Sequence, residues 1–203
     1  MSSPLFKAKR RIILASGSPR RRELLKDHFD LKVLVPKTDE EPLRGERPRP
    51  YLNRVSLNKW RACLQQFPSH FKGAPQVLIS ADTVVVLNGK ILGKPESKKH
   101  ATYMLSQLSG KRHRVITAVC CGWSHGEPQV REVTTFVTFR KLSERDLTIY
   151  LETGEWKDKA GAYGIQGQAL KLVRRLEGSL SNVVGLPLDE SLRLIVKTLS
   201  RRR

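Results

Sequence analysis

The run from Val77 to Leu87 constrains the fold most, because it is rich in Val and Ile and ends at the dipeptide Asn88-Gly89. Such a run is typical of a buried strand, and Asn-Gly between two apolar segments is a strong indication of a β-hairpin. We therefore predict a strand over Val77–Leu87, joined by a tight turn to a short strand over Lys90–Leu92. The longest apolar stretch runs from Val77 to Leu92 and is interrupted by Asp82 and by the turn. Its uninterrupted parts are too short to span a bilayer.

Strand-like and helix-like segments alternate along the rest of the chain, and this alternation predicts an α/β fold. Helices are indicated by apolar residues at helical spacing between capping residues, and strands by short apolar runs. The predicted strands cover Arg11–Ser16, Arg114–Trp123, Val130–Arg140 and Lys171–Leu176. The predicted helices cover Pro19–Phe29, Tyr51–Phe67, Ser97–Gly110, Ser143–Gly154 and Asp189–Leu199, and an exposed loop covers Thr38–Pro50.

The chain is strongly basic, with 38 Lys and Arg against 19 Asp and Glu and a formal net charge of +19. This excess favours polyphosphate ligands, nucleic acid or anionic surfaces as partners. A solvated basic surface is the simpler explanation, and the sequence has no RNP-like aromatic motif, zinc finger or basic zipper. We therefore do not expect nucleic acid or a membrane as the primary partner.

Composition and cysteine content limit the class of protein further. Hydrophobic residues make up 39% and charged residues 28%, which indicates a globular chain and excludes collagen-like, mucin-like and prion-like classes. Cys63, Cys120 and Cys121 lack zinc-ligand spacing, and we expect Cys120 and Cys121 to be a buried pair in a soluble, cytoplasmic protein. We expect residues 1–10 to be a basic leader without fixed structure and residues 11–200 to form a single domain.

The first candidate site is the segment Ala15-Ser16-Gly17-Ser18-Pro19-Arg20-Arg21, where a strand meets a helix through a glycine turn. Unpaired N–H groups gather at such a turn, and Arg20 and Arg21 add guanidinium groups suited to phosphate oxygens. We interpret the segment as a phosphate-binding turn, although a capped helix with surface arginines explains the same residues. Walker A and GxGxxG patterns are absent, which excludes ordinary P-loop and Rossmann sites.

The second candidate is Asp82, an acid inside the apolar run Val77–Leu87. Burying a carboxylate costs free energy unless the group is paired with a cation or bound to a metal ion. We expect Asp82 to act as a general base or to organise magnesium, with Lys94 brought near by the hairpin turn. An edge strand whose Asp82 faces water is the alternative.

The third candidate is the segment from Asp158 to Gly167, which has glycines at positions 161, 164 and 167. Glycines at this spacing let the backbone approach a ligand closely. Gln166 offers an amide with donors and an acceptor, which suits the edge of a nucleobase. A plain loop would explain the glycines by themselves.

Six segments together give the chain a resemblance to the Maf (septum formation protein) family of nucleotide pyrophosphatases. The resemblance extends from about Arg11 to Leu199, with one departure at Trp156, where the family often has proline. The segments are LASGSPRRRELL at 14–25, SADTVV at 80–85, LGKP at 92–95, LSGKRHRVITAV at 108–119, DKAGAYGIQG at 158–167 and VVGLPL at 183–188.

The resemblance implies an inosine-triphosphatase-like α/β fold, with a mixed twisted sheet and two lobes around a central cleft. It implies hydrolysis of a nucleoside triphosphate to the monophosphate and pyrophosphate by metal-assisted attack of water on the α-phosphorus. The DKAGAYGIQG form resembles the branch that acts on dTTP, UTP and modified pyrimidine triphosphates. The resemblance further implies a Mg²⁺ or Mn²⁺ cofactor, a possible homodimer, and a role in nucleotide-pool sanitation or cell-division arrest.

The family's functional positions map onto nine residues of this chain. The general base falls on Asp82, and the metal positions fall on Glu40 and Asp82. The phosphate-binding positions fall on Ser16, Arg20, Arg21, Lys59 and Lys94, and the specificity positions fall on Arg20, Thr83 and Gln166.

Two other functions remain open at this stage. One is a pyrophosphatase for deaminated purine nucleotides such as ITP or XTP, against which the Gln166 segment counts. The other is a basic nucleic-acid-binding or cell-division interaction protein with an inactive pocket, which the charge of +19 supports.

Overall fold

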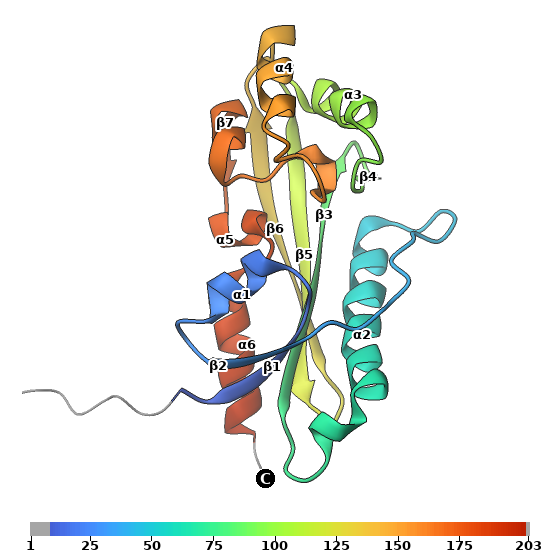
Figure 1. Cartoon of the computed structure of the whole chain (residues 1–203), viewed down its shortest axis with the longest axis vertical. Coiled ribbons are helices and arrows are strands. Elements are labelled where there is room, and N and C mark those ends of the chain that lie inside the picture. Colours follow the sequence, from blue (N-terminus) through green and yellow to red (C-terminus); the bar gives the residue numbers. More distant parts are fainter. Residues whose placement is uncertain (1–8, 202–203) are drawn as a thin grey trace, which may run out of the picture.

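The computed structural model describes residues 9–201, in which seven strands and the helices alternate along the chain (Figure 1). The strands are β1 (Arg11–Ala15), β2 (Asp30–Leu34), β3 (Val77–Leu87), β4 (Lys90–Leu92), β5 (Arg112–Trp123), β6 (Gln129–Phe139) and β7 (Val173–Glu177). The α-helices are α1 (Pro19–Leu25), α2 (Pro48–Gln66), α3 (Lys98–Leu108), α4 (Glu144–Glu152), α5 (Leu180–Val184) and α6 (Leu188–Ser200). Short 3₁₀ helices are η1 (Pro68–Phe71), η2 (Ala160–Ala162) and η3 (Gly167–Leu172).

All seven strands belong to one mixed sheet, which confirms the predicted α/β class with a mixed sheet. The strand order is β2-β1-β3-β5-β6-β7, and β4 pairs with β3 outside this path. The pairs β1–β2 and β1–β3 are parallel, whereas β3–β4, β3–β5, β5–β6 and β6–β7 are antiparallel. The hairpin predicted at Asn88-Gly89 is present as the β3–β4 pair.

Strand β3 is paired along one edge and only partly along the other. On one edge, residues 77–86 pair continuously with β5. On the opposite edge, residues 78–80 pair with β1 and residues 85–87 pair with β4. Within the described part of the chain, residues 81–84 have no partner strand on that edge. The gap contains Asp82 and Thr83, two of the three polar residues of β3.

Helices cover both faces of the sheet (Figure 1). Helix α2 packs Leu52 and Val55 against one face, where the side chains of Val84 and Val86 lie. On the other face, α6 covers the end of the sheet near β1, and α3 and α4 cover the end near β4. Because successive side chains of a strand point to opposite faces, Asp82 lies on the α2 side and Thr83 on the other.

Several element boundaries differ from the predictions. Helix α1 ends at Leu25 and not at Phe29, because a turn over residues 26–28 redirects the chain into β2. Helix α2 begins at Pro48, inside the predicted loop, since proline is compatible with the first turn of a helix. Strand β7 begins at Val173 and not at Lys171, because residues 167–172 form η3. The predictions missed β2 and α5.

The remaining predictions concern the ends of the chain and the cysteines. Most of the expected basic leader, residues 1–8, lies outside the described residues, as do Arg202 and Arg203. Within residues 9–201, no helix is both long and apolar enough to cross a bilayer. All three cysteines are free and buried, which confirms the predicted burial of Cys120 and Cys121, and burial raises the pKa of each thiol to about 12.

Candidate active site

The segment between β1 and α1 forms a tight turn at the gap in β3. Ser16 is buried, and its hydroxyl accepts a hydrogen bond from the backbone N–H of Ser18 at 3.2 Å. Ser18 occupies the N-cap position of α1, but its side chain makes no capping hydrogen bond. A Cβ at Gly17 would lie 3.2 Å from the Val35 side chain, so a larger residue there would require Val35 to shift by a few tenths of an ångström. The turn therefore presents backbone and hydroxyl groups to the adjoining space.

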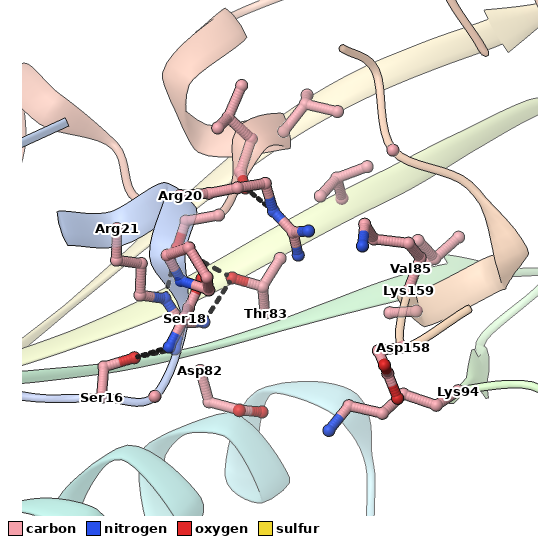
Figure 2. Close-up of a pocket in the computed structure, with 18 of the residues that line it drawn as sticks. Ser16, Ser18, Arg20, Arg21, Asp82, Thr83, Val85, Lys94, Asp158 and Lys159 are labelled. Atoms are coloured by element: carbon pink, nitrogen blue, oxygen red, sulfur yellow. Dashed lines mark hydrogen bonds between the residues drawn. The ribbon is translucent and has the colours of Figure 1, made fainter. Parts of the chain in front are cut away.

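Arg21 connects this turn to two other parts of the fold. Its three guanidinium nitrogens donate to Gly185 O at 2.8 Å, Ser16 Oγ at 3.2 Å and Thr83 Oγ1 at 3.1 Å (Figure 2). All three acceptors are neutral, and the side chain is buried. Burial lowers the pKa of Arg21, while the negative charge of Asp82 acts in the opposite direction. Arg21 is therefore a buried cation fixed by neutral oxygens, and it makes the wall of the site positive.

Arg20 uses only part of its guanidinium group for the protein. Its Nε donates to Val184 O at 3.1 Å, and Figure 2 shows the other two nitrogens directed into the cavity. Burial lowers the pKa of Arg20, and the carboxylate of Asp158 partly offsets that effect. The free end of the guanidinium group can therefore bind an anion.

Asp82, Lys59 and Glu40 form an ion-pair cluster on the α2 side of the gap. Lys59 Nζ lies 2.7 Å from Asp82 Oδ1 and 3.0 Å from Glu40 Oε1. Asp82 is 7% exposed, so it does not face bulk water as an ordinary edge-strand carboxylate would. The hydroxyl of Tyr51 donates to the backbone oxygen of Glu40 at 2.8 Å and anchors the acidic loop to α2. The structure thus brings together three residues that are far apart in the sequence.

Thr83 joins the same gap to the opposite face of the sheet. Its hydroxyl lies 2.9 Å from Thr117 Oγ1 and 3.2 Å from Gly185 O, and it accepts from Arg21. Thr117 also lies 3.4 Å from the backbone oxygen of Asn182. The predicted specificity position Thr83 is therefore fixed in a network of protein hydrogen bonds.

The loop of residues 158–168, which lies between α4 and β7, closes the other side of the site. Gly161 has φ +66°, and a Cβ there would lie 2.9 Å from Val85, so glycine allows the loop to lie directly on β3. The N–H of Gly161 donates to Gly93 O at 3.0 Å, which places the loop beside Lys94. The backbone N–H of Gln168 donates to the Glu155 carboxylate at 3.0 and 3.2 Å and closes the loop at its base. Gln166 is exposed on this wall.

Lys159 is a site residue that the sequence analysis missed. It lies on the cavity wall on the same side as Lys94 and opposite Arg20 (Figure 2). Its Nζ donates to Lys157 O at 3.2 Å, and burial together with the nearby Arg20 charge lowers its pKa. The residue stands in the DKAGAYGIQG segment, in which the sequence points to the glycines and Gln166 as ligand-binding positions. Its neighbour Asp158, in a left-handed conformation at φ +56°, was missed too.

One cavity of about 830 Å³ is lined by residues from each of these parts of the chain. Every predicted site residue lines it: Ser16, Arg20, Arg21, Glu40, Lys59, Asp82, Thr83, Lys94 and Gln166. Ala15 and Val85, which flank the gap in the pairing of β3, line it as well. A cavity of this volume is within the range that takes a small organic ligand. Its cationic walls and one buried carboxylate suit an anionic ligand that reacts at the carboxylate.

The carboxylates are suited to a hard divalent cation. Among residues 9–201, no cluster of three or more His, Cys, Asp or Glu side chains could hold a metal without further ligands. Glu40 and Asp82 nevertheless lie close enough to share one ammonium group. Mg²⁺ is commonly held by one or two carboxylates together with substrate phosphates, and the oxygen donors of this pair fit that arrangement.

Comparisons with known proteins agree with the motifs. Residues 11–198 match the family model described as "Maf-like protein". The chain is 47% identical over 188 residues to the dTTP/UTP pyrophosphatase of Photorhabdus laumondii, covering 92% of this chain and 93% of that protein. It is 43% identical over 183 residues to the dTTP/UTP pyrophosphatase of Acinetobacter baylyi, covering 90% and 96%.

Solved structures resemble the chain less closely. The dITP/XTP pyrophosphatase of Mycobacterium abscessus aligns with a TM-score of 0.42 and 17% identity, covering 65% of this chain and 75% of that one. The Ham1 protein of Staphylococcus aureus aligns with a TM-score of 0.44 and 16% identity, covering 64% and 72%. The family match over residues 11–198 and the high identity to curated relatives decide the assignment, and the chain belongs to the Maf-like protein family.

Proposed function

We propose that this protein hydrolyses dTTP and UTP to the nucleoside monophosphate and pyrophosphate. The observation that carries the proposal is the buried carboxylate of Asp82 in a cavity that is also lined by five cationic side chains, those of Arg20, Arg21, Lys59, Lys94 and Lys159. The names of the relatives at 43–47% identity support the same substrates. They do not favour a purine-specific enzyme or a protein with an inactive pocket. We further propose that residues 11–200 act as one catalytic domain.

The cations would hold the triphosphate. A nucleoside triphosphate carries about four negative charges. In a site without a Walker motif, Arg and Lys side chains can neutralise these charges and bind the phosphate oxygens through charge-assisted hydrogen bonds. The free end of Arg20 and the ammonium groups of Lys94 and Lys159 face the cavity. Ser16 adds a hydroxyl at the turn, and the buried charge of Arg21 contributes through the field in the cavity. Lys59 lies beside the carboxylates and would approach the phosphate nearest to Asp82.

Asp82 would act as the general base. Lys59 holds Oδ1 at 2.7 Å, and Oδ2 accepts no hydrogen bond from the described part of the chain. A water molecule at Oδ2 would transfer a proton to the carboxylate while its oxygen forms a bond to the α-phosphorus. The bond from the α-phosphorus to the bridging oxygen breaks, and the electron pair leaves with pyrophosphate. Positive charge from Arg20 and the lysines would stabilise that leaving group.

Glu40 and Asp82 would hold a divalent cation together with the substrate phosphates. When bound, such an ion polarises the phosphoryl group and neutralises developing charge. Lys59 would remain beside both carboxylates and keep Asp82 oriented.

Base selection would depend on the wall that carries Gln166. The amide of Gln166 is exposed on the cavity surface and can donate to and accept from a pyrimidine edge. Trp156 supports this wall, because it is buried and its Nε1 donates to Leu151 O at 3.0 Å. Trp156 therefore occupies the position of the family's usual proline as an anchor of the loop.

The proposal is tested by hydrolysis of UTP, dTTP, CTP, ITP and 7-methyl-GTP with added Mg²⁺ or Mn²⁺, carried out in ¹⁸O-labelled water. We expect pyrophosphate from UTP and dTTP, with the label in the monophosphate because water attacks the α-phosphorus. Label in pyrophosphate would place the attack on the β-phosphorus. Preference for ITP would transfer the protein to the purine-specific class, and no hydrolysis by a folded sample would refute the enzymatic assignment.

A further inference from the structure

A second cluster of basic residues lies where β5 begins, β6 ends and β7 begins. The three segments are held side by side by backbone hydrogen bonds: Gly110 N to Arg140 O at 3.0 Å, Phe139 N to Lys111 O at 3.1 Å, and Arg140 N to Leu172 O at 3.0 Å. Figure 1 shows β7, α3 and α4 at this end of the long axis, opposite the last turn of α6. Fold topology thus gathers basic residues that are more than sixty positions apart in the sequence.

The cluster contains an excess of cations, and we call it the β5–β7 cluster. Asp146 pairs with Arg140, and Glu177 pairs with both Arg112 and Arg175. The other four cations of the cluster are Lys111, Lys141, Lys171 and Arg174, and within residues 9–201 they form no ion pair with a carboxylate. The members of the cluster are Lys111, Arg112, Arg140, Lys141, Lys171, Arg174 and Arg175. Unpaired cations held close together repel each other, and an anionic partner would relieve that repulsion.

The surface of the cluster is hollowed. A depression of about 670 Å³ is lined by the hydroxyl-bearing Ser106, Ser109 and Thr138 and by the cationic Arg140, Lys141 and Arg174. It shares no lining residue with the catalytic cavity. Hydroxyl, ammonium and guanidinium groups are the usual donors to phosphate oxygens in nucleic acids. The segment Ser109-Gly110-Lys111-Arg112 therefore contributes here and not to the catalytic cavity.

An aromatic and guanidinium pair lies next to the depression. Arg112 Cζ lies 3.7 Å from the centre of the Phe136 ring, and the Arg112 side chain is about half exposed. Thr138, which lines the depression, is the sheet partner of Arg112 on one side and of Arg175 on the other. Guanidinium planes and aromatic rings provide stacking surfaces for unpaired bases. Phosphate donors and a stacking surface thus lie on adjacent residues.

We propose that the β5–β7 cluster binds single-stranded nucleic acid, independently of the catalytic cavity. The strand's phosphates would contact Lys141, Lys171 and Arg174, and a base would stack on Arg112. The stacking surface favours a nucleic acid over polyphosphate, which has no base. Exposed bases are available in a single strand but not in a duplex.

The test is fluorescence-anisotropy titration of the full protein with a short labelled oligouridylate that has no 5′-triphosphate, at several salt concentrations. The variant Lys141→Gln/Lys171→Gln/Arg174→Gln removes three cations of the cluster. A matched control, Lys32→Gln/Arg193→Gln/Lys197→Gln, removes three exposed cations of β2 and α6. Loss of three phosphate contacts should weaken binding by about 100-fold at 0.1 M salt and reduce the log–log salt slope by about 2. The control should stay within about threefold of the unmodified protein.

Equal losses in the two triple variants would overturn the proposal, because net charge by itself would then explain binding. Arg112→Lys keeps the charge and removes the planar group, so it should weaken oligouridylate binding by about fivefold and leave polyphosphate binding unchanged. An equal effect on both polymers would remove the stacking role and identify a general polyphosphate surface instead. Competition by α,β-methylene-UTP would place the strand in the catalytic cavity and refute an independent site. Absence of binding near physiological salt would refute it as well.

Discussion

Lys59 Nζ lies 2.7 Å from Asp82 Oδ1, and the same ammonium lies 3.0 Å from Glu40 Oε1. One ammonium group therefore contacts both carboxylates and offsets the electrostatic repulsion between them. The contact uses Oδ1, Oδ2 accepts no hydrogen bond from residues 9–201, and Asp82 lines the cavity. Lys59 is thus suited to orient the proposed base, and its position explains why α2 and β3 must be packed together before the site exists.

Replacement of the proposed base should nearly abolish turnover. We expect Asp82→Asn to lower kcat for UTP by about 10²–10⁴-fold, because the amide cannot accept the proton of water. Steady-state pyrophosphate release measures the effect, with Asp189→Asn at the exposed start of α6 as a control. Near-normal turnover by a folded Asp82→Asn protein would exclude the base role.

Arg21→Lys should reduce the stability of the fold. The substitution keeps a buried charge but cannot reproduce the three hydrogen bonds to Gly185, Ser16 and Thr83. We expect the free energy of unfolding to fall by about 1.5–3 kcal/mol in urea denaturation. Arg22→Lys, on the exposed side of α1, should change it by less than about 0.5 kcal/mol. Equal stability of the two variants would mean that the Arg21 contacts contribute little.

Lys159→Met should weaken substrate binding more than it slows catalysis. We expect KM for UTP to rise by about tenfold, because one charge-assisted phosphate contact is lost. Burial lowers the pKa of Lys159, so the unmodified enzyme should also show KM rising with pH before the ordinary lysine range is reached. The variant should lack that rise. Lys157→Met, outside the cavity, is the control, and a parallel change in it would argue against a specific contact.

Gln166→Ala should relax base selection without affecting folding. The amide is exposed, so its loss leaves no unpaired buried group. The ratio of kcat/KM for UTP to that for CTP should fall by about 10-fold, because an edge-specific hydrogen bond is removed. An unchanged ratio, with unchanged thermal unfolding, would transfer base selection to another part of the wall.

His113 should make the fold sensitive to acid. Its Nε2 lies 2.7 Å from the Tyr163 hydroxyl in the interior, and burial lowers its pKa to about 4. The unfolded state, with a histidine pKa of about 6.5, binds the proton more readily, so stability is complete above pH 6.5 and decreases as pH falls toward 4. The loss should reach about 3 kcal/mol. Urea titrations at several pH values give the slope of the unfolding free energy against pH. In His113→Gln this slope should correspond to one proton fewer taken up on unfolding, and the same slope in both proteins would contradict this account.

Elements with local chemical determinants were predictable from the sequence. The Asn88-Gly89 hairpin is present, and the helices predicted to start at Ser97 and Ser143 are capped by these serines, because each feature depends on neighbouring residues. Elements that depend on tertiary partners were not predictable. Strand β2 pairs in parallel with β1, and its Lys32 interrupts the apolar pattern that would have revealed it.

In the site as well, the residues could be predicted from the sequence but their contacts could not. Seven of its nine predicted residues stand in the six ordered segments, Glu40 and Lys59 lie outside them, and all nine line one cavity. Their contacts could not be read from the segments. The three neutral acceptors of Arg21 come from the β1–α1 turn, from β3 and from the residue after α5. The cavity-facing position of Lys159 depends in the same way on how its loop lies against β3.

The interrupted pairing of β3 has a consequence for solubility as well as for access. An unpaired strand edge in a chain rich in Val and Ile invites another strand to add to it and can start aggregation. Here the open edge spans only residues 81–84 and carries the carboxylate of Asp82, which is paired with Lys59. Strand addition would require these charges to lose their polar surroundings. The proposed catalytic carboxylate would therefore also protect the sheet from its own exposed edge.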